Sequence, residues 1–551
     1  MPRYYSWGAE QVAPGRWSFA LWSPEAREVA AEVEGRRIPL DAKDGWHIGE
    51  GAAEAGERYK LIVDGQAIPD PASRAQEGDV HSASVLTPPA PPPEWAGRPW
   101  EEAVIYELHL GLFTEGGTFA SARARLPELA ALGITAVEIM PVGQFPGRRG
   151  WGYDGVLTYA PHNTYGSPQD FRDFVAAAHD LGIMVLLDVV YNHFGPDGNW
   201  IGAVTPSFFD PSEHTPWGAA IAFDQPPVRR FFIENAIYWL RDFGLDGLRF
   251  DAVDQIRDPD FLAEMAAAIR AEGFTRPIHL TTEDNRNITA LHHPDSGDYD
   301  GEWNDDYHHC IHVLLTGETH DYYASFGHDP MGDLCLSLQC GYVEQGQPRP
   351  PNKTGRGEPS CDLPWPAFVN FNQNHDQTGN RAKGERLLAL ADADAVKVAH
   401  GLLLLSPFTP LMFMGEEAGE TAPFQFFADY EGELAVKTRE GRAKEFPGFE
   451  FTDPIDPETY EACRPRADDP VWRDLTKRLL DFRHDRIVPL VKSGRAGEAS
   501  VERTGPRSAV AEWPFNAGRL RIAVDFGDGS AQRGLFGMAE GKCSLSLWIE
   551  A

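Results

Sequence analysis

The sequence predicts an α/β protein in which a (β/α)8 TIM barrel lies between an N-terminal β-sandwich and a small C-terminal β-domain. Through the middle of the chain, short apolar strands alternate with amphipathic helices, a pattern typical of βα units on a parallel sheet. Both ends instead carry short alternating segments between Gly and Pro turns. The length agrees with several units, because 551 residues exceed the roughly 250 to 300 at which one core stops growing.

The expected boundaries follow changes in composition. Residues 1–88 form the β-sandwich, and a proline-rich stretch over 87–100 is expected to be an extended, semi-rigid connector. The catalytic barrel with inserted loops is placed at 99–464, and a helix plus the C-terminal β-domain at 465–551. No internal repeat is found.

Seven strand segments can be recognised in the barrel region, each mostly apolar and ending in polar or charged residues. They are AVIYELHL, TAVEIMPV, IMVLLDVVYNH, DGLRFDAV, PIHLTTED, FVNFNQNHD and PLMFMGEE. In such barrels the active site lies at the carboxyl ends of the strands, where these polar residues gather. Two long loops, 194–226 and 341–368, are expected to be functional or mobile.

Charge and cysteine content limit the partners. The formal charge of -34 repels a phosphate backbone, so nucleic acid is not expected as a partner, whereas a neutral substrate is. Six cysteines without a CxxC pair are too sparse for a disulfide scaffold, which favours a reducing cytoplasm. The N-terminus lacks the features of a signal peptide and no long apolar run occurs, so we expect a soluble protein without membrane contact.

Two carboxylates are placed for glycosidic chemistry. Arg249 and Asp251 are two residues apart in a strand and therefore share a face, and the guanidinium favours the ionised form that a nucleophile needs. Asp251 is the candidate nucleophile. Glu283 ends the next strand, where burial and a nearby carboxylate would raise its pKa and suit it as general acid/base. Such a pair about 5 to 5.5 Å apart defines a retaining mechanism.

Further polar residues at strand ends suit sugar binding. Asp376 is the third candidate carboxylate, able to bind hydroxyls and favour ring distortion. Carboxylates and histidines that grip hydroxyls, with an aromatic ring against the sugar face, make a carbohydrate subsite. The candidate substrate-binding residues are Tyr153, Asp188, His193, Arg249, His375 and Gln377. No cofactor or metal is expected, although a structural calcium held by scattered ligands has no local motif.

Some neighbouring residues are left unassigned. Charged strand-end residues are more often solvated or ion-paired than bound to substrate, and clustered histidines more often have a structural role. Trp151 is a further aromatic near the predicted cleft. The unassigned polar residues are Asp284, Glu416, Glu417, His308 and His309.

Four segments in order, DVVYNH, GLRFDAV, TTED and FNQNHD, resemble the short regions shared by the α-amylase superfamily, glycoside hydrolase family thirteen. The resemblance implies closure of the barrel, a retaining mechanism and an α-glucosidic substrate. By the match, Asp251, Glu283 and Asp376 take the nucleophile, acid/base and third-carboxylate positions. The family has a small residue where Thr282 precedes the acid, which we interpret as local packing.

A finer resemblance, over residues 58 to 446, is to the maltooligosyltrehalose trehalohydrolase family, which implies maltooligosyl trehalose or a related α-glucan as substrate. Branching enzymes are the first alternative, since they share the barrel and carboxylates but usually have Glu where Gln377 stands and Gln where Asp154 stands. A non-catalytic glucan-binding protein is the second alternative, since fold alone does not establish activity. Retention of all three carboxylates argues against it.

Overall fold

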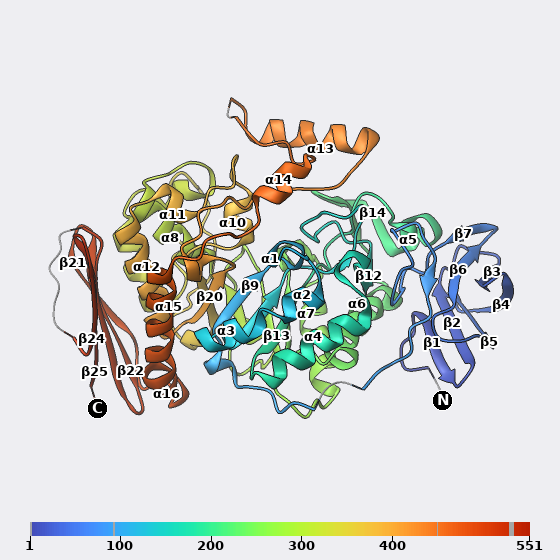
Figure 1. The fold of residues 1–551 in the computed structure, drawn as a ribbon, viewed down its shortest axis with the longest axis horizontal. Helices are drawn as coiled ribbons and strands as arrows, with labels where there is room; N and C mark the ends of the chain where they lie inside the picture. The colour runs from blue at the N-terminus through green and yellow to red at the C-terminus, as the bar shows by residue number, and fades with distance from the viewer. Residues whose placement is uncertain (1–2, 92–93, 449, 528–533, 551) are drawn as a thin grey trace.

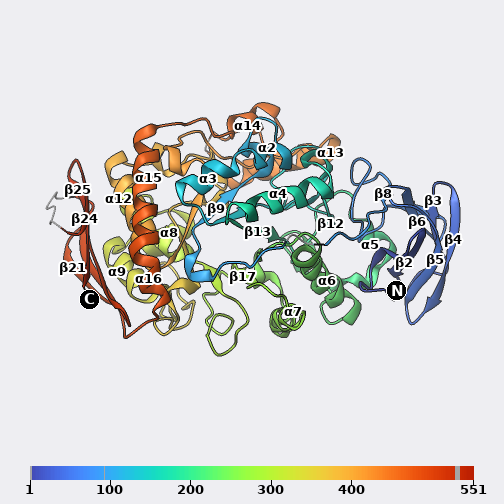
Figure 2. The same ribbon diagram turned by 60° about the horizontal axis from the view of Figure 1, so that its bottom comes forward.

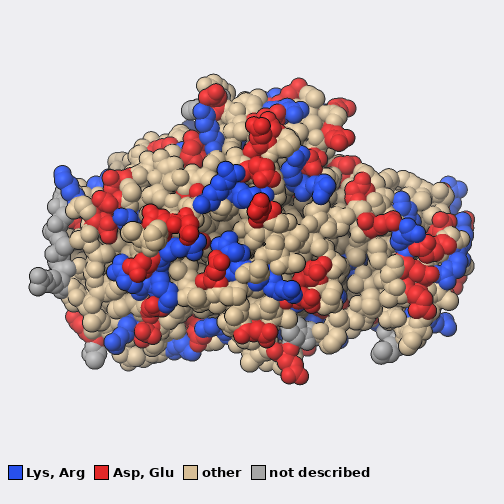
Figure 3. All heavy atoms as spheres, in the orientation of Figure 1, with Lys and Arg blue, Asp and Glu red and all other residues tan. Residues whose placement is uncertain are grey.

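The computed structural model describes residues 3–91, 94–448, 450–527 and 534–550. Three parts follow one another along its long axis, with the N-terminal strands at one end, the barrel in the middle and the C-terminal sheet at the other (Figure 1). Figure 2 shows the same order after a turn about that axis. On the face drawn in Figure 3, acidic and basic side chains are interspersed in spite of the net charge of -34.

The middle of the chain closes into a barrel of eight parallel strands, in the order β10-β13-β16-β17-β18-β19-β20-β9, which confirms the predicted fold class. The strands are β9 (Ile105–Leu108), β10 (Ala136–Ile139), β13 (Met184–Val189), β16 (Gly247–Phe250), β17 (His279–Thr282), β18 (Gly301–Trp303), β19 (Phe368–Phe371) and β20 (Thr409–Phe413). Seven coincide with the segments recognised in the sequence. The eighth, β18, was missed.

Helices follow the strands and cover the barrel (Figures 1 and 2). A capping box of Ser167 and Asp170 with Pro168 at the first turn starts α4 (Pro168–Asp180), whose buried Phe171, Phe174 and Val175 face the sheet. The other helices up to residue 405 are α1 (Leu110–Phe113), α2 (Phe119–Arg123), α3 (Leu126–Leu132), α5 (Trp200–Val204), α6 (Pro226–Asp242), α7 (Pro259–Ala271), α8 (Asp305–Thr316), α9 (Pro330–Cys340), α10 (His375–Gly379), α11 (Leu387–Leu390) and α12 (Ala393–Leu405).

Loops at the carboxyl ends of the strands carry small additions. The expected long loop 194–226 contains a hairpin, and the 341–368 loop stays irregular until a short helical turn, η6 (Trp365–Ala367). After β20 the chain forms α13 and α14, which project over the barrel in Figure 1. These additions are β11 (Gly143–Gln144), β12 (Leu157–Pro161), β14 (Phe209–Thr215), β15 (Gly218–Ile221), α13 (Gly432–Glu445) and α14 (Pro457–Ala462).

The N-terminal part is an antiparallel sheet of eight strands, paired in the order β1-β2-β5-β4-β3-β6-β7 with β8 beside β6. The strands are β1 (Gly8–Ala13), β2 (Arg16–Trp22), β3 (Val29–Val33), β4 (Arg36–Lys43), β5 (Trp46–Ala52), β6 (Arg58–Val63), β7 (Gln66–Ile68) and β8 (Ser84–Val85). The sheet folds over on itself, because Phe19 of β2 meets Tyr59 of β6, a strand that does not pair with β2, with ring centroids 5.4 Å apart. Apolar side chains therefore pack between its two halves, as in a sandwich.

One arginine joins this sheet to the barrel. The guanidinium of Arg74 is buried among three tyrosine rings, with its carbon 4.9 Å from the centroid of Tyr5, 4.0 Å from Tyr159 and 4.4 Å from Tyr238. Tyr5 comes from the N-terminal part, and the other two rings belong to β12 and α6. A desolvated cation over aromatic faces is a favourable contact, so Arg74 fixes the two parts together.

The C-terminal part is a helix followed by a five-stranded antiparallel sheet in the order β21-β22-β23-β25-β24. The predicted helix is continuous but contains a π-helical turn at Arg483–Ile487, where Arg483 donates to the carbonyls of residues 404, 406 and 408. Its elements are α15 (Pro470–Phe482), α16 (Val488–Lys492), β21 (Ser500–Gly505), β22 (Ser508–Phe515), β23 (Gly518–Asp525), β24 (Phe536–Glu540) and β25 (Cys543–Glu550).

A disulfide joins Cys340 to Cys361, which the sequence analysis did not expect. The two residues are 21 positions apart, and the 341–368 loop returns so that their Cα atoms lie 4.0 Å apart. This return is a property of the fold and leaves no trace in cysteine spacing. Among the described residues, no helix is both long and apolar enough to cross a bilayer.

Candidate active site

The carboxyl ends of β13, β16 and β17 bring the predicted carboxylates together. Asp188 on β13 is in register with Arg249 on β16, which is in register with Thr281 on β17. Side chains at one level of a parallel barrel that point inward meet at its mouth. Asp251 and Glu283 lie just beyond these positions, where each chain leaves its strand.

Arg249 is the centre of the site. Its Nη1 lies 2.7 Å from Oδ2 of Asp188 and 2.8 Å from Oδ1 of Asp251, and its Nη2 lies 2.6 Å from Oε2 of Glu283. The guanidinium is buried, with 1% of its side chain exposed, while 15% of the Glu283 side chain reaches the surface. Asp251 and Glu283 thus bind neighbouring nitrogens of one guanidinium, which holds the two carboxyls close together.

The backbone beside the nucleophile also holds the acid. Ala252 has a φ of 41°, in the left-handed region, and its N–H donates to Oε2 of Glu283 over 3.1 Å. A non-glycine residue in that region is uncommon and is tolerated where surrounding contacts demand it. The turn after β16 therefore orients the Glu283 carboxyl toward Asp251.

Burial decides the protonation of the pair. It raises the pKa of Asp251 to about 6, even though Arg249 acts to lower it and Asp188 adds to the rise. Arg249 favours the ionised form of Asp251, as the sequence predicted, but burial outweighs it. At pH 7 a carboxyl with a pKa of about 6 is still mostly ionised. Burial likewise raises the pKa of Glu283, as expected, with Asp251 contributing.

Glu107 orients His375 and favours its protonated form. Nδ1 of His375 lies 2.5 Å from Oε1 of Glu107 on β9, and its backbone N–H donates to the other carboxylate oxygen over 3.0 Å. Burial acts to lower the pKa of His375, but Glu107 outweighs it and the pKa is raised. Asp376, next to it at the start of α10, has a pKa raised by burial and by the charge of Glu283.

Tyr153 and His193 form one wall of the mouth. The Tyr153 hydroxyl donates to Oδ2 of Asp188 over 2.6 Å, and its ring stacks on His375 with centroids 5.1 Å apart. His193 lies 3.0 Å from the Tyr153 carbonyl and stacks on Trp217 with centroids 4.3 Å apart. Burial lowers the pKa of His193 to about 4, so it is neutral. The wall thus presents an aromatic surface beside hydrogen-bonding groups.

Gln377 contacts a carboxylate that the sequence analysis did not single out. Its Nε2 donates to Oδ1 of Asp305 over 2.9 Å. Burial, with the charges of Glu283 and Asp376, raises the pKa of Asp305 to about 8. Asp305 is therefore largely protonated at neutral pH and able to donate a hydrogen bond.

Three further residues at the site were missed. Trp303 of β18 lies under Arg249, with its ring centroid 4.0 Å from the guanidinium carbon. Glu107 holds His375, and Glu138 of β10 is buried with neither carboxylate oxygen hydrogen-bonded to a described residue. Burial, then the charges of Glu107 and Asp188, raise the pKa of Glu138 well above its usual value. Glu107 and Glu138 could have been found in the sequence, because each is a glutamate inside an otherwise apolar strand segment, YELHL and AVEIM.

The unassigned residues have structural contacts. Glu417 bonds to Tyr106, Asp284 pairs with Arg286, and Glu416 accepts from the backbone of residue 413. His308 lies within hydrogen-bonding distance of the carbonyl of residue 372 and of Tyr323, and His309 packs against aromatic rings. Thr282 is buried and donates to Glu302, which agrees with a packing role. Within the described residues, no group of three His, Cys, Asp or Glu is arranged to hold a metal ion.

Comparisons with known proteins point to one family. The model of the alpha amylase catalytic domain matches residues 102–218. A malto-oligosyltrehalose trehalohydrolase from Saccharolobus solfataricus is 40% identical over 454 residues, 79% of each chain. A crystal structure from Salmonella typhimurium, provisionally named an alpha amylase, matches with a TM-score of 0.95 and 43% identity, over 99% of this chain and 100% of that one. A 1,4-alpha-glucan branching enzyme from Bordetella parapertussis is 35% identical over 278 residues, only 44% of this chain and 38% of its own.

Proposed function

This chain belongs to the malto-oligosyltrehalose trehalohydrolase family of the α-amylase superfamily, and we propose on that premise that it hydrolyses the α-1,4-glucosidic bond next to the trehalose end of maltooligosyl trehalose. The products are trehalose and a maltooligosaccharide. The observation that carries the proposal is the cluster in which one buried guanidinium holds Asp188, Asp251 and Glu283 at the barrel mouth.

The reaction takes two steps. The Asp251 carboxylate attacks the anomeric carbon, the bond to the trehalose oxygen breaks, and Glu283 gives its proton to that oxygen. Glu283, now ionised, then takes a proton from water, whose oxygen displaces Asp251 from the anomeric carbon. Two carboxyls on neighbouring nitrogens of one guanidinium suit attack by Asp251 itself, and the two successive inversions at the anomeric carbon retain its configuration. With a pKa of about 6, Asp251 is mostly ionised at pH 7, and the raised pKa of Glu283 favours the protonated form that a general acid needs.

The remaining candidates bind the sugar at the cleavage site. His375, whose protonated form Glu107 favours, donates to a hydroxyl while Asp376 accepts from one, and both interactions strengthen as the ring distorts toward the oxocarbenium-like transition state. The Tyr153 ring packs on the apolar face of the sugar, and His193 presents a neutral imidazole beside it. Asp188, bonded to Tyr153 and Arg249, and Gln377, bonded to Asp305, are the other two proposed substrate-binding residues.

The two alternatives make different products. A branching enzyme passes the glycosyl intermediate to a sugar hydroxyl instead of to water, and the partial similarity to such an enzyme keeps this reaction as a competitor. Gln377, bonded to Asp305, stands where branching enzymes usually carry Glu, and so favours hydrolysis. A glucan-binding protein without activity would make no product at all.

Product analysis tests the proposal. The purified protein is incubated with maltotriosyl trehalose and, separately, with amylose, with Asp251→Asn as the matched inactive control. Trehalose plus maltotriose, absent in the control, is the expected result. New branch points in amylose without trehalose would favour the branching reaction, and inertness toward both would favour the binding protein.

We also propose that the protein acts in the cytoplasm, where a neutral glucan is available. The disulfide between Cys340 and Cys361 is unusual for a reducing compartment, so the compartment needs its own test. Cell fractionation, followed by thiol labelling before and after reduction, measures both the location and the state of this pair. Recovery outside the cytoplasm would refute this proposal without affecting the reaction.

A further inference from the structure

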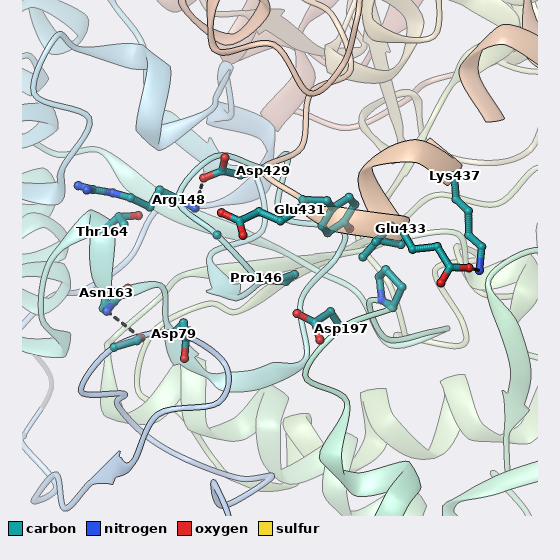
Figure 4. Close-up of a pocket in the computed structure, with 15 residues that line it drawn as sticks. Asp79, Pro146, Arg148, Asn163, Thr164, Asp197, Asp429, Glu431, Glu433 and Lys437 are labelled. Atoms are coloured by element: carbon teal, nitrogen blue, oxygen red, sulfur yellow. Dashed lines mark hydrogen bonds and ion pairs between the residues drawn. The ribbon is translucent and has the colours of Figure 1, made fainter. Parts of the chain in front are cut away.

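A large cavity lies beside the active site. Its volume is about 1140 Å3, above the roughly 300 to 1,000 Å3 typical of small-molecule sites. Five short stretches line it, 78–79, 146–148, 163–164, 196–197 and 429–437, and none of the lining residues belongs to the proposed catalytic set. Figure 4 shows Asp79 from the N-terminal part, Asp197 from the loop after β13, and Glu431 and Glu433 from the α13 segment around one space.

The cavity is part of the fixed structure. Gln144 and Asn163, from the barrel, both donate to the carbonyl of Gly78, over 3.1 and 2.8 Å, and hold the N-terminal loop against the barrel. On the opposite side Asp429 accepts from the backbone N–H of Arg148 over 2.8 Å and pairs with Arg149. The walls are therefore held by direct contacts of the barrel loops with the N-terminal loop and with the segment before α13.

Two connections place the cavity next to the catalytic mouth. The segment that carries Tyr430 in the cavity wall is joined to the Tyr153 loop, because Ala428 forms an antiparallel β-bridge with Gly150. Pro196 and Asp197 line it and continue the loop that carries His193. The cavity thus begins where the wall formed by Tyr153 and His193 ends.

The barrel order indicates which part of the substrate reaches it. The lining loops follow β10, β13 and β20, on one side of the barrel, whereas Glu283 follows β17 across the mouth. The general acid must lie beside the leaving group, which is trehalose in the proposed reaction. The glucan chain on the other side of the cleaved bond therefore extends toward the cavity.

The lining fits an uncharged polyol. Five carboxylates against one lysine and one arginine disfavour a phosphate or another anion, while carboxylate oxygens accept hydrogen bonds from hydroxyl groups. The Glu433 carboxylate is paired with Lys437, and Asp197 lies 3.2 Å from His81, so two of the five carboxylates have a basic partner at the rim. Pro146, Pro196 and Leu434 supply apolar contacts for the carbon faces of a sugar.

We infer that this cavity binds the distal glucose units of the maltooligosaccharide, so that the N-terminal part and α13 select long substrates over short ones. The inference rests on the proposed function. It adds a second binding region that acts on substrate length and leaves the chemical step unchanged.

Kinetics on substrates of two lengths test the inference. Leu434→Trp fills the cavity and Glu431→Ala removes a hydrogen-bond acceptor, while Glu440→Ala, on the same helix but outside the lining, is the control. We expect KM for maltopentaosyl trehalose to rise about tenfold in both cavity variants, because Glu431→Ala loses a hydrogen bond to a charged group and Leu434→Trp occupies space that a glucose unit needs. KM for maltosyl trehalose and kcat for both substrates should stay within about twofold, as in the control.

The outcomes separate the two proposals. An equal change of KM for both lengths, or none for either, in variants with an unchanged melting temperature would overturn the inference while trehalose release continued. Absence of trehalose from both substrates with the unaltered protein would instead overturn the proposed function. A kcat loss confined to the short substrate would also contradict the inference.

Discussion

Replacement of Arg249 by Met should move the acid limb of the activity profile upward. The guanidinium contacts Asp251 at 2.8 Å, and two charges about 4 Å apart interact by about 4 kcal/mol at an effective dielectric constant near 20. At 1.36 kcal/mol per unit this corresponds to at most about three pKa units. The pKa of Asp251 would then rise from about 6 toward about 9.

The sign follows from the role of the group. The nucleophile acts only when ionised, so in the natural protein kcat/KM should fall as the pH drops through about 6. In Arg249→Met that fall should begin near pH 9, and at pH 7 only about one molecule in a hundred would hold an ionised Asp251. Activity should therefore drop about a hundredfold at pH 7 and partly recover at pH 9.

The assay is trehalose release from maltotriosyl trehalose between pH 5 and 10. Arg249→Lys is the matched control, because it keeps the positive charge but loses the planar fork that binds two carboxylates. We expect its acid limb to stay near pH 6 with a lower kcat. Since loss of a buried charge costs about 3 to 5 kcal/mol, thermal unfolding must show that the Met variant is folded. An unchanged acid limb in folded Arg249→Met would refute the reasoning.

Four other changes have defined outcomes. Asp251→Asn should abolish trehalose release and leave glucan binding within about twofold by calorimetry; residual turnover would remove Asp251 from the nucleophile role. Glu107→Gln removes the carboxylate that raises the pKa of His375, so NMR titration should show a fall in that pKa together with a higher KM. Trp303→Phe weakens the contact with Arg249 and should cost about 1 kcal/mol in urea unfolding, whereas no loss would show that the ring contributes only shape. Chelation by EDTA should leave both activity and melting temperature unchanged, and a drop in either would reveal a structural cation.

The sequence predicted the parts of the fold that produce strong local patterns. Seven barrel strands were recognised because each is a run of apolar residues that ends in polar ones. The strand β18 has only three residues, Gly301–Trp303, between acidic neighbours, and so produces no apolar run. Pairing with β17 and β19, and not its own composition, makes it a strand. This strand carries Trp303, whose ring lies beneath Arg249.

The same limit applies to the site. The order of four short segments was enough to select Asp251, Glu283 and Asp376, and the structure brings the first two onto one guanidinium. The direction of the pKa shift of Asp251 was not predictable, because it depends on burial that only the closed barrel creates. Asp305 was missed because it lies 72 residues before Gln377 in the sequence, and only the fold brings the two side chains into contact.

The burial of Arg74 between the N-terminal part and the barrel limits how the two parts can be recombined in engineered proteins. The N-terminal part supplies Arg74 and Tyr5, and the barrel supplies Tyr159 and Tyr238. Replacement of either part alone would therefore separate the guanidinium from its rings. A chimera with a foreign N-terminal domain would leave a cavity beside Tyr159 and Tyr238 at the interface between the two parts. The N-terminal strands and the barrel should therefore be transplanted together. If the N-terminal part alone is exchanged to alter glucan recognition, the new part should supply an arginine and a tyrosine at the positions of Arg74 and Tyr5.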